Sequence, residues 1–259
     1  MTDKHDSDLV LVETSDRVRT VTMNRPEARN ALSSALQRAL AAALTDAGDD
    51  SDVDVVILTG ADPAFCAGLD LKELGQGGEV VGGADPVAAS PFAALWKASK
   101  PVIGAINGSC ITGGFELALA CDFLVASERA RFGDSHARVG FTPAGGMSVL
   151  LPQAVGLRKA REMSLTGNFV DAAEAYRLGL VNHVVPHEEL LPLARKLAAD
   201  IASCDQDAVR SMKRIYDRSW RVTGNDAIAY ELEVFAGRTL DATTIESRRQ
   251  AVVDRGRNQ

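Results

Sequence analysis

The chain has 259 residues, of which 46% are hydrophobic and 24% charged, and its formal net charge is −7. This length supports one large hydrophobic core with at most a small appendage. The acidic balance argues against nucleic-acid binding, since affinity for phosphate backbones needs basic surface. The start is polar and no apolar run reaches about 18 residues, so we expect a cytoplasmic protein with no membrane partner. No CxxC pair or His/Cys cluster occurs, which predicts buried, reduced thiols and no metal site; the cysteines are Cys66, Cys110, Cys121 and Cys204.

Strands and helices alternate in the first third of the chain. In order, apolar periodicity predicts strands at 9–14 and 18–23, a helix at about 33–47, a strand at 53–60, a short helix at 69–75 and a glycine-rich stretch at 75–85. The largely apolar run at 53–60 is typical of a strand buried in a parallel sheet.

The segment 101–122 carries the most specific signal. It predicts a buried strand at 101–106, a turn rich in Gly, Ser and Thr, and a helix whose apolar body contains one carboxylate, Glu116. A carboxylate among apolar residues needs a partner or a proton. Gly113 and Gly114 stand at the start of this helix, where backbone N–H groups have no acceptor within the helix. The segment can therefore hold a developing negative charge beside an acid or base.

The remaining elements continue the alternation and then become helical. We expect a strand at 123–126, helices at 147–154 and near 157–164, a capped helix at 171–179, a strand at 180–186 and only helices from Glu188 onward. The fold class is therefore α/β, with a core over 1–200 and an all-helical region over 201–259. Apolar residues of this tail should pack on the core and on neighbouring subunits; they are Val209, Met212, Ile215, Tyr216, Ile228, Leu232 and Phe235.

Five motifs follow one another in an order that resembles the enoyl-CoA hydratase/isomerase family, the crotonase superfamily. They are MNRPEARNALS at 23–33, ILTGADPAFCAGLDLKEL at 57–74, KPVIGAINGSCITGGFELALACDFLVAS at 100–127, RFGDSHARVGFTPAGGMSVLLPQAVG at 131–156 and LTGNFVDAAEAYRLGLVNHVVP at 165–186. The resemblance implies a crotonase-like spiral of ββα units and a homotrimer or dimer of trimers assembled through the helical tail. It also implies chemistry on acyl-coenzyme A thioesters through an enolate, with coenzyme A as part of the substrate and no permanently bound cofactor.

The resemblance also assigns an oxyanion hole. Its two donors correspond to the backbone N–H of Leu69, in the sequence AGLD, and the backbone N–H of Gly113. Two donors near a developing enolate oxygen suit this chemistry, since losing one such donor costs about 10² to 10³ in rate. Asp70, directly after Leu69, is expected chiefly to cap the helix that follows.

Coenzyme A contacts are implied for two stretches. The family lines its adenine pocket with the stretch matching 64–68, and Arg29 and the arginines of 248–257 are candidates for the phosphates, with a solvated surface role as the alternative. The predicted contacts are Ala28, Arg29, Ala64, Phe65, Ala67, Gly68, Leu69 and Asp70.

Two acids define a hydratase in this family. Glu116 stands at the first position, which activates water for attack at C3, and His136 stands where a second carboxylate delivers the proton to C2. Histidine can move a proton near neutral pH, although His136 could instead fill space or orient a substrate. Asp134 is set aside as a replacement acid, because a shift of two residues redirects the side chain.

Retention of the first carboxylate favours hydration, since isomerases with a single acid keep the second position instead. We therefore expect a lyase that adds water across the 2,3 double bond of an enoyl-CoA. One alternative is another acyl-CoA reaction using Glu116 and His136, namely isomerisation, decarboxylation or thioester hydrolysis. The other is a non-catalytic acyl-CoA-binding homologue.

Overall fold

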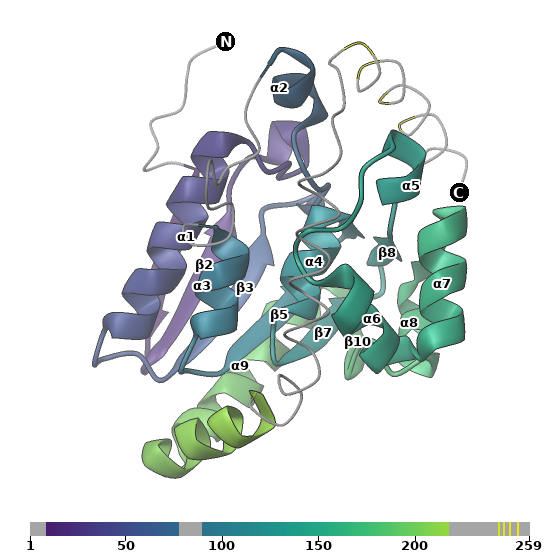
Figure 1. Cartoon of the computed structure of the whole chain (residues 1–259). Coiled ribbons are helices and arrows are strands. Elements are labelled where there is room, and N and C mark those ends of the chain that lie inside the picture. Colours follow the sequence, from purple (N-terminus) through teal and green to yellow (C-terminus); the bar gives the residue numbers. More distant parts are fainter. Residues whose placement is uncertain are drawn as a thin grey trace.

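The computed structural model describes residues 9–77 and 90–217, together with Thr243, Glu246, Arg249 and Val253. Ten strands in these ranges form two sheets (Figure 1). The large sheet has the order β1 (Val10–Ser15), β2 (Val18–Met23), β3 (Val55–Gly60), β5 (Val102–Ile106), β7 (Phe123–Ser127) and β10 (His183–Val185). The small sheet has the order β4 (Ala64–Cys66), β6 (Ser109–Ile111), β8 (Arg131–Gly133) and β9 (Phe169–Asp171).

Helices follow most of these strands. In chain order they are η2 (Pro26–Ala28), α1 (Ser34–Asp49), α2 (Leu71–Gly75), α3 (Pro91–Lys97), α4 (Gly113–Leu119), α5 (His136–Val139), α6 (Met147–Val155), α7 (Leu157–Thr166), α8 (Ala172–Arg177), η3 (His187–Glu189) and α9 (Leu190–Ala202). Ser33 caps α1 through its side chain, and Asp171 caps α8 in the same way.

Each repeating unit sends one strand to each sheet. β3, β5 and β7 lie parallel in the large sheet, and their successors β4, β6 and β8 lie parallel in the small one. The small sheet closes on β9, which is antiparallel to β8. Successive pairs therefore advance like the turns of a spiral, and the predicted crotonase-like α/β fold is confirmed.

The middle of the large sheet is buried on both faces, whereas its edge strand β1 is largely exposed. Val56 and Leu58 of β3 belong to one apolar cluster, and Val55 and Ile57 belong to another, because successive side chains of a strand point to opposite sides. α9 covers the second cluster with three residues spaced one helical turn apart, Leu190, Ala194 and Ala198. In Figure 1 this helix lies below the sheet, whereas α1 and α3 lie on the other side.

The small sheet is the part of the fold that the sequence prediction missed. The turn predicted after residue 106 contains β6, and β4, β8 and β9 were not predicted at all. Each of these strands has three residues, which is too short to display an alternating pattern. The last predicted strand, 180–186, is also shorter than expected, since β10 covers only His183–Val185. α3 and α5 are further additions, whereas the other predicted elements agree with the structure to within about two residues at most ends.

The prediction of four buried thiols was wrong for Cys204. This residue follows α9 and is exposed, and Cys121 is only half-buried, whereas Cys66 and Cys110 are buried. Burial raises the pKa of Cys66 to about 12, so this thiol is protonated at neutral pH. All four cysteines are free.

Buried cations hold the C-terminal end of α1. The Nζ atom of Lys100 donates to the carbonyl oxygens of Ala47 at 2.9 Å and Asp50 at 2.5 Å, and burial lowers the pKa of this lysine. Arg19 pairs with Asp46 at 2.7 Å and with the Asp50 carboxylate at 2.5 Å. These cations lie where unpaired carbonyl groups concentrate negative charge at a helix end.

Asp54 joins the N-terminal hairpin to the helical tail. Its carboxylate accepts hydrogen bonds from Nε and Nη2 of Arg17 and lies 3.6 Å from Arg210, which belongs to the helical segment 206–217. The bond from Arg17 is the largest influence on Asp54 and outweighs burial, so the pKa of this carboxyl lies below its ordinary value. Asp54 is therefore a fixed anion between two permanent cations.

The described part of the tail docks through charge and leaves apolar side chains exposed. Lys213 donates to Asp122 at 2.7 Å. Met212, Ile215 and Tyr216 are 55%, 63% and 70% exposed. Ile228, Leu232 and Phe235, predicted to join them, lie outside the described residues, as do Arg248 and Arg257.

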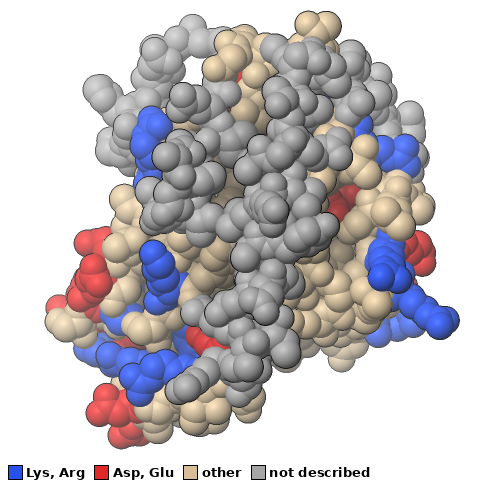
Figure 2. Space-filling view, viewed as in Figure 1, with Lys and Arg blue, Asp and Glu red and all other residues tan. Residues whose placement is uncertain are grey.

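Charged side chains of both signs spread over the visible face of the molecule (Figure 2). Lys and Arg atoms gather over α7, whose sequence contributes Arg158, Lys159 and Arg161. None of the helices within the described ranges is long and apolar enough to cross a bilayer.

Candidate active site

The helix that carries Glu116 begins at a strained turn. β6 ends at Ile111, and Thr112 precedes α4 with φ 52° and ψ −111°, a backbone conformation that β-branched residues rarely adopt. Gly114 then packs against the small sheet so closely that a Cβ there would lie 2.3 Å from the carbonyl oxygen of Cys66. The start of α4 is thereby fixed against β4.

Two backbone amides face each other at this turn. A Cβ built on Gly113 would lie 3.7 Å from the amide nitrogen of Leu69, and one built on Gly68 would lie 3.4 Å from the amide nitrogen of Gly113. Gly68 has φ +91°, which glycine adopts readily. Neither amide donates a hydrogen bond to a residue in the described ranges. The predicted donors are thus neighbours, and the two glycines keep the space beside them open.

Glu116 is 4% exposed, and its carboxylate is held by the start of α6 and the residue before Gly146. Its Oε1 atom accepts hydrogen bonds from the backbone N–H groups of Gly145 at 2.7 Å and Met147 at 3.4 Å. A Cβ on Gly145 would lie 2.8 Å from the Glu116 carboxyl carbon, so a side chain at this position would displace the carboxyl group. Hydrogen bonds from two N–H groups stabilise the ionised carboxylate, which suits a base.

His136 lies opposite Glu116 and is 7% exposed. Its Nε2 atom is 3.8 Å from Oε2 of Glu116, which is beyond hydrogen-bond distance. On the other side of the ring, Nδ1 lies 2.7 Å from Oδ1 of Asp134, and the same oxygen accepts the backbone N–H of His136 at 3.0 Å. The structure therefore brings the two predicted acid/base residues together and adds Asp134 behind the imidazole.

Asp134 is an anion at neutral pH despite being 1% exposed. Burial opposes ionisation most strongly, but it is outweighed by the hydrogen bond from the His136 ring, by the charge of that ring when protonated, and by hydrogen bonds from Ser164 and the His136 backbone. The pKa of Asp134 consequently lies below its ordinary value. An ionised carboxylate only accepts hydrogen bonds, so the proton between the two groups belongs to Nδ1 of His136.

A pair of hydroxyl groups links the two halves of the site. Oγ1 of Thr112 lies 2.6 Å from Oγ of Ser135 and accepts the backbone N–H of Ser135 at 3.1 Å. Thr112 precedes Gly113, and Ser135 stands between Asp134 and His136. The turn that presents the Gly113 amide is thereby tied to the loop that presents the imidazole.

The residues predicted to contact coenzyme A lie in two adjacent segments. The Ala67 N–H donates to the Arg29 carbonyl at 3.0 Å, and the Leu32 N–H donates to the Gly68 carbonyl at 2.7 Å. Arg29 is exposed and Ala28 is half-buried next to it.

The side chains of Ala64 and Phe65 belong to the buried core, so any ligand contact there would use the backbone. The Ala64 carbonyl already accepts a hydrogen bond from Nδ2 of Asn30 at 2.7 Å. Asn30 was not singled out in the sequence analysis. Its side chain links the two segments through this hydrogen bond, and its backbone has φ 55°. Asp70 caps α2, as predicted, by accepting from the N–H groups of Lys72 and Glu73.

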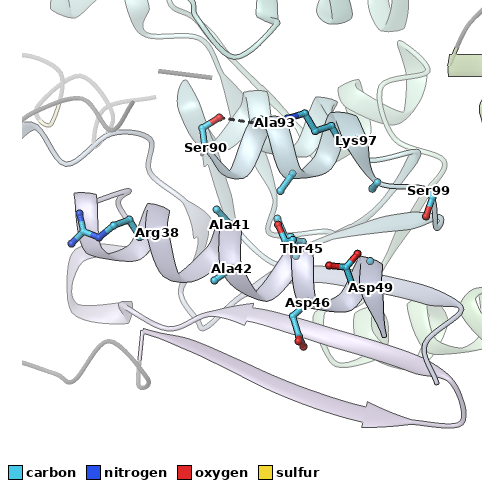
Figure 3. Close-up of a pocket in the computed structure, with 14 residues that line it drawn as sticks. Arg38, Ala41, Ala42, Thr45, Asp46, Asp49, Ser90, Ala93, Lys97 and Ser99 are labelled. Carbon is cyan, nitrogen blue, oxygen red and sulfur yellow. Dashed lines mark hydrogen bonds between the residues drawn. The ribbon is translucent and has the colours of Figure 1, made fainter. Parts of the chain in front are cut away.

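A hollow lies between α1 and α3 (Figure 3). Small side chains such as Ala41, Ala42 and Ala93 form its walls, and Arg38, Lys97 and Asp49 stand around it. Ser90, on its α3 side, caps that helix by accepting the Ala93 N–H. This hollow contains none of the predicted site residues.

Comparison with known proteins identifies the family of this chain. The family model described as enoyl-CoA hydratase/isomerase matches residues 13–256. This chain belongs to that family. A probable enoyl-CoA hydratase of Rhizobium meliloti is 41% identical over 230 residues, which cover 87% of this chain and 88% of the relative. The short-chain-enoyl-CoA hydratase of Clostridium acetobutylicum is 36% identical over 228 residues, 87% of each chain.

Solved structures give the same result. The enoyl-CoA hydratase from Mycobacterium smegmatis is 50% identical with a TM-score of 0.79, and the match covers 88% of this chain and 96% of that one. The enoyl-CoA hydratase from Mycobacterium tuberculosis H37Rv is 49% identical with a TM-score of 0.79, over 94% and 100% of the two chains.

Proposed function

We propose that this protein is an enoyl-CoA hydratase, which adds water across the 2,3 double bond of an enoyl-CoA thioester. The observation that carries the proposal is the position of Glu116. It is a buried carboxylate with one oxygen held by two N–H groups and the other facing His136, on a helix that starts at the open Gly113 amide.

The proposed reaction uses two proton transfers. Glu116 removes a proton from water as the water oxygen forms its bond to C3, and the displaced electron pair moves onto the thioester oxygen. The Leu69 and Gly113 N–H groups stabilise this enolate oxygen, an arrangement in which each donor is worth about 10² to 10³ in rate. His136 then delivers a proton to C2. Each positioned proton transfer contributes about 10² to 10⁴.

The remaining site predictions form part of the proposal. Coenzyme A arrives as part of the substrate and lies along η2 and the segment 64–70, where Arg29 offers an exposed guanidinium for a phosphate. The reaction needs no permanently bound cofactor, because side chains move both protons. A cytoplasmic location also remains a prediction, which fractionation of the source cells would test.

The proposed assembly is a homotrimer or a dimer of trimers, with residues 1–200 forming the catalytic core and 201–259 the trimerising region. The exposed side chains of Met212, Ile215 and Tyr216 support it, since apolar groups gathered on one helix are a common mark of an interface. Light scattering at micromolar concentration should give three or six times the chain mass. A stable monomer would contradict this assembly.

The activity is tested with a panel of enoyl-CoA thioesters that includes crotonyl-CoA. Hydration removes the conjugated double bond, so the thioester absorbance should fall at a rate proportional to enzyme concentration. Mass spectrometry of the product should show the addition of one water. A product of unchanged mass would indicate isomerisation, and no turnover of any thioester would indicate a binding protein.

A further inference from the structure

We propose that Asp134 and His136 act as one proton-donating unit, in which Asp134 is the positioning residue that makes the imidazole equivalent to a carboxylic acid. This inference rests on the proposed hydration, in which His136 protonates C2. It assigns a role to Asp134 that neither the sequence motif nor the family match provides.

Asp134 holds the imidazole on its Nδ1 side. Oδ1 of Asp134 accepts both the Nδ1–H at 2.7 Å and the backbone N–H of His136 at 3.0 Å, so the carboxylate sets both the ring orientation and the start of α5. The ring then presents Nε2 to the site, 3.8 Å from Glu116. That separation is beyond hydrogen-bond distance, so Nε2 faces Glu116 without being bonded to it.

The charges of the unit match those of a carboxyl group. With Nε2 protonated, the imidazolium and the Asp134 carboxylate sum to zero, as a protonated acid does. After the proton leaves, the neutral imidazole and the carboxylate sum to −1, as an ionised acid does. A lone histidine would instead change from +1 to zero and would present a different field to the enolate.

The proton step balances within the site. The Nε2–H bond of His136 breaks and its electron pair stays on Nε2, while the enolate double bond supplies the pair that forms the new C2–H bond. Glu116 meanwhile holds the proton taken from water. Transfer of that proton from Glu116 to Nε2, directly or through one solvent molecule, restores both groups without a net change in charge.

Within the described ranges, the charged groups that face this imidazole come from two elements. Glu116 faces it from α4, and Asp134 faces it from the loop between β8 and α5. Both are carboxylates, so both favour the protonated ring. Of the two, only Asp134 contacts it at hydrogen-bond distance, and it therefore fixes the tautomer as well as the charge.

Asp134→Asn tests the unit because it keeps the shape and removes the charge. Turnover of a thioester that the wild type hydrates should fall about 10- to 100-fold, with KM changed by less than about threefold. The alkaline limb of the pH–rate profile should move to lower pH, because the carboxylate no longer stabilises the imidazolium. A merely structural role would lower the melting temperature without moving this limb.

His136→Glu and the double variant Asp134→Asn/His136→Glu complete a cycle. The single variant places a second carboxylate beside buried Asp134, whereas the double variant leaves one carboxyl group with the charge states of the original unit. The double variant should therefore be about 10-fold more active than His136→Glu alone. Equal or higher activity of His136→Glu alone would overturn the inference.

Asp62→Asn is the matched control. Asp62 also contacts a histidine, His187 Nε2 at 3.0 Å, but this pair lies outside the candidate site. Its removal should leave turnover and the pH profile unchanged. If the Asp134→Asn protein fails to fold, ¹⁵N spectra of the wild type decide: Nδ1 of His136 should keep its proton at every pH at which the protein is folded.

The outcomes separate this inference from the proposed function. A wild type that hydrates no thioester contradicts the function, and the ¹⁵N spectra still test the unit. A wild type that hydrates crotonyl-CoA while Asp134→Asn retains its rate and pH profile contradicts the inference alone. A neutral His136 ring that carries its proton on Nε2 would also overturn it.

Discussion

Two buried carboxylate clusters, at Asp54 and at Glu116, have different partner groups and opposite roles. At Asp54, two arginines contact or approach one carboxylate, and neither titrates in the physiological range. At Glu116, the basic group that faces the carboxylate within the described ranges is His136, whose Nε2 stands 3.8 Å away and is charged only when protonated. The ion pairs of Asp54 hold structural elements together and keep their charges, whereas Glu116 and His136 can exchange a proton. Burial alone therefore does not make a carboxylate catalytic. Whether its partner group can gain and lose a proton determines its role.

Lys100 extends this contrast. It is a buried cation whose pKa is lowered by burial, yet its ammonium group donates to the carbonyl groups of Ala47 and Asp50. Both of these hydrogen bonds go to the C-terminal end of α1, which contains none of the proposed catalytic residues. Ion pairs in that region stabilise the fold, and their removal should change unfolding without changing chemistry.

The largest effect is expected for Glu116→Gln, which removes the proposed base from the titratable cluster. Gln keeps the size and the capacity to accept the Gly145 N–H, so folding and thioester affinity should be retained. Turnover should fall by about 10² or more in steady-state assays of crotonyl-CoA hydration. Activity within about threefold of wild type would remove Glu116 from the mechanism.

Gly145→Ala should disturb the same carboxylate by a steric clash. The added methyl group would lie 2.8 Å from the Glu116 carboxyl carbon and displace it. A displacement near 1 Å costs up to about 10² in rate, so kcat should fall about 10- to 100-fold. Gly48→Ala in α1 is the matched control, because a Cβ there meets nothing within 4 Å. Equal rates for the two variants would contradict the close fit at Gly145.

Asp54→Asn should lower stability and leave turnover unchanged, which is the reverse of the effect expected for Gly145→Ala. Losing the charge that binds Arg17 and Arg210 should lower the free energy of unfolding by about 2 kcal/mol, measured with urea, while kcat stays unchanged. The folded pKa of Asp54 is lowered, so its contribution is present above the unfolded value of about 3.9 and is lost as pH falls below it. The stability difference from wild type should therefore shrink in acid. A difference that persists at pH 2 would argue against a charge effect.

The smallest effect is expected at the hydroxyl pair. Thr112→Val keeps the branched shape but leaves the Ser135 N–H without its acceptor, which should lower kcat about 5- to 10-fold and leave KM near wild type. Thr112→Ser keeps the hydroxyl group and should restore most of the rate. If both variants behave alike, the backbone strain at Thr112 matters and the hydrogen bond does not.

How well the sequence predicts a strand or helix depends on the number of residues in that element. Five strands of the large sheet, each with five or six residues, and the long helices show apolar patterns, and Glu116 is visible as one charge in an apolar helix. The three-residue strands of the small sheet show no pattern, because three residues cannot display an alternation. Family motifs supplied the positions of Leu69, Gly113 and His136, and the structure brings these residues to one place.

Asp134 shows why the remaining site residues stayed hidden. Sequence spacing correctly indicated that Asp134 and His136 do not occupy the same position, but it gave no sign that the two side chains bond to each other. That contact depends on the turn between β8 and α5. The hydrogen bonds of Gly145 and Ser135 depend in the same way on loops whose course no periodicity reports.

The contacts of Asp122 fasten the tail to the helix that carries the proposed base. α4 ends at Leu119, and Asp122, three residues on, accepts the Val102 N–H at 2.7 Å and the Lys213 ammonium at 2.7 Å. A protease that trims the chain behind residue 205 would cut this fastening while leaving both sheets intact. Inactivation should then precede unfolding, which would make lost hydration an early sign of tail cleavage in stored preparations.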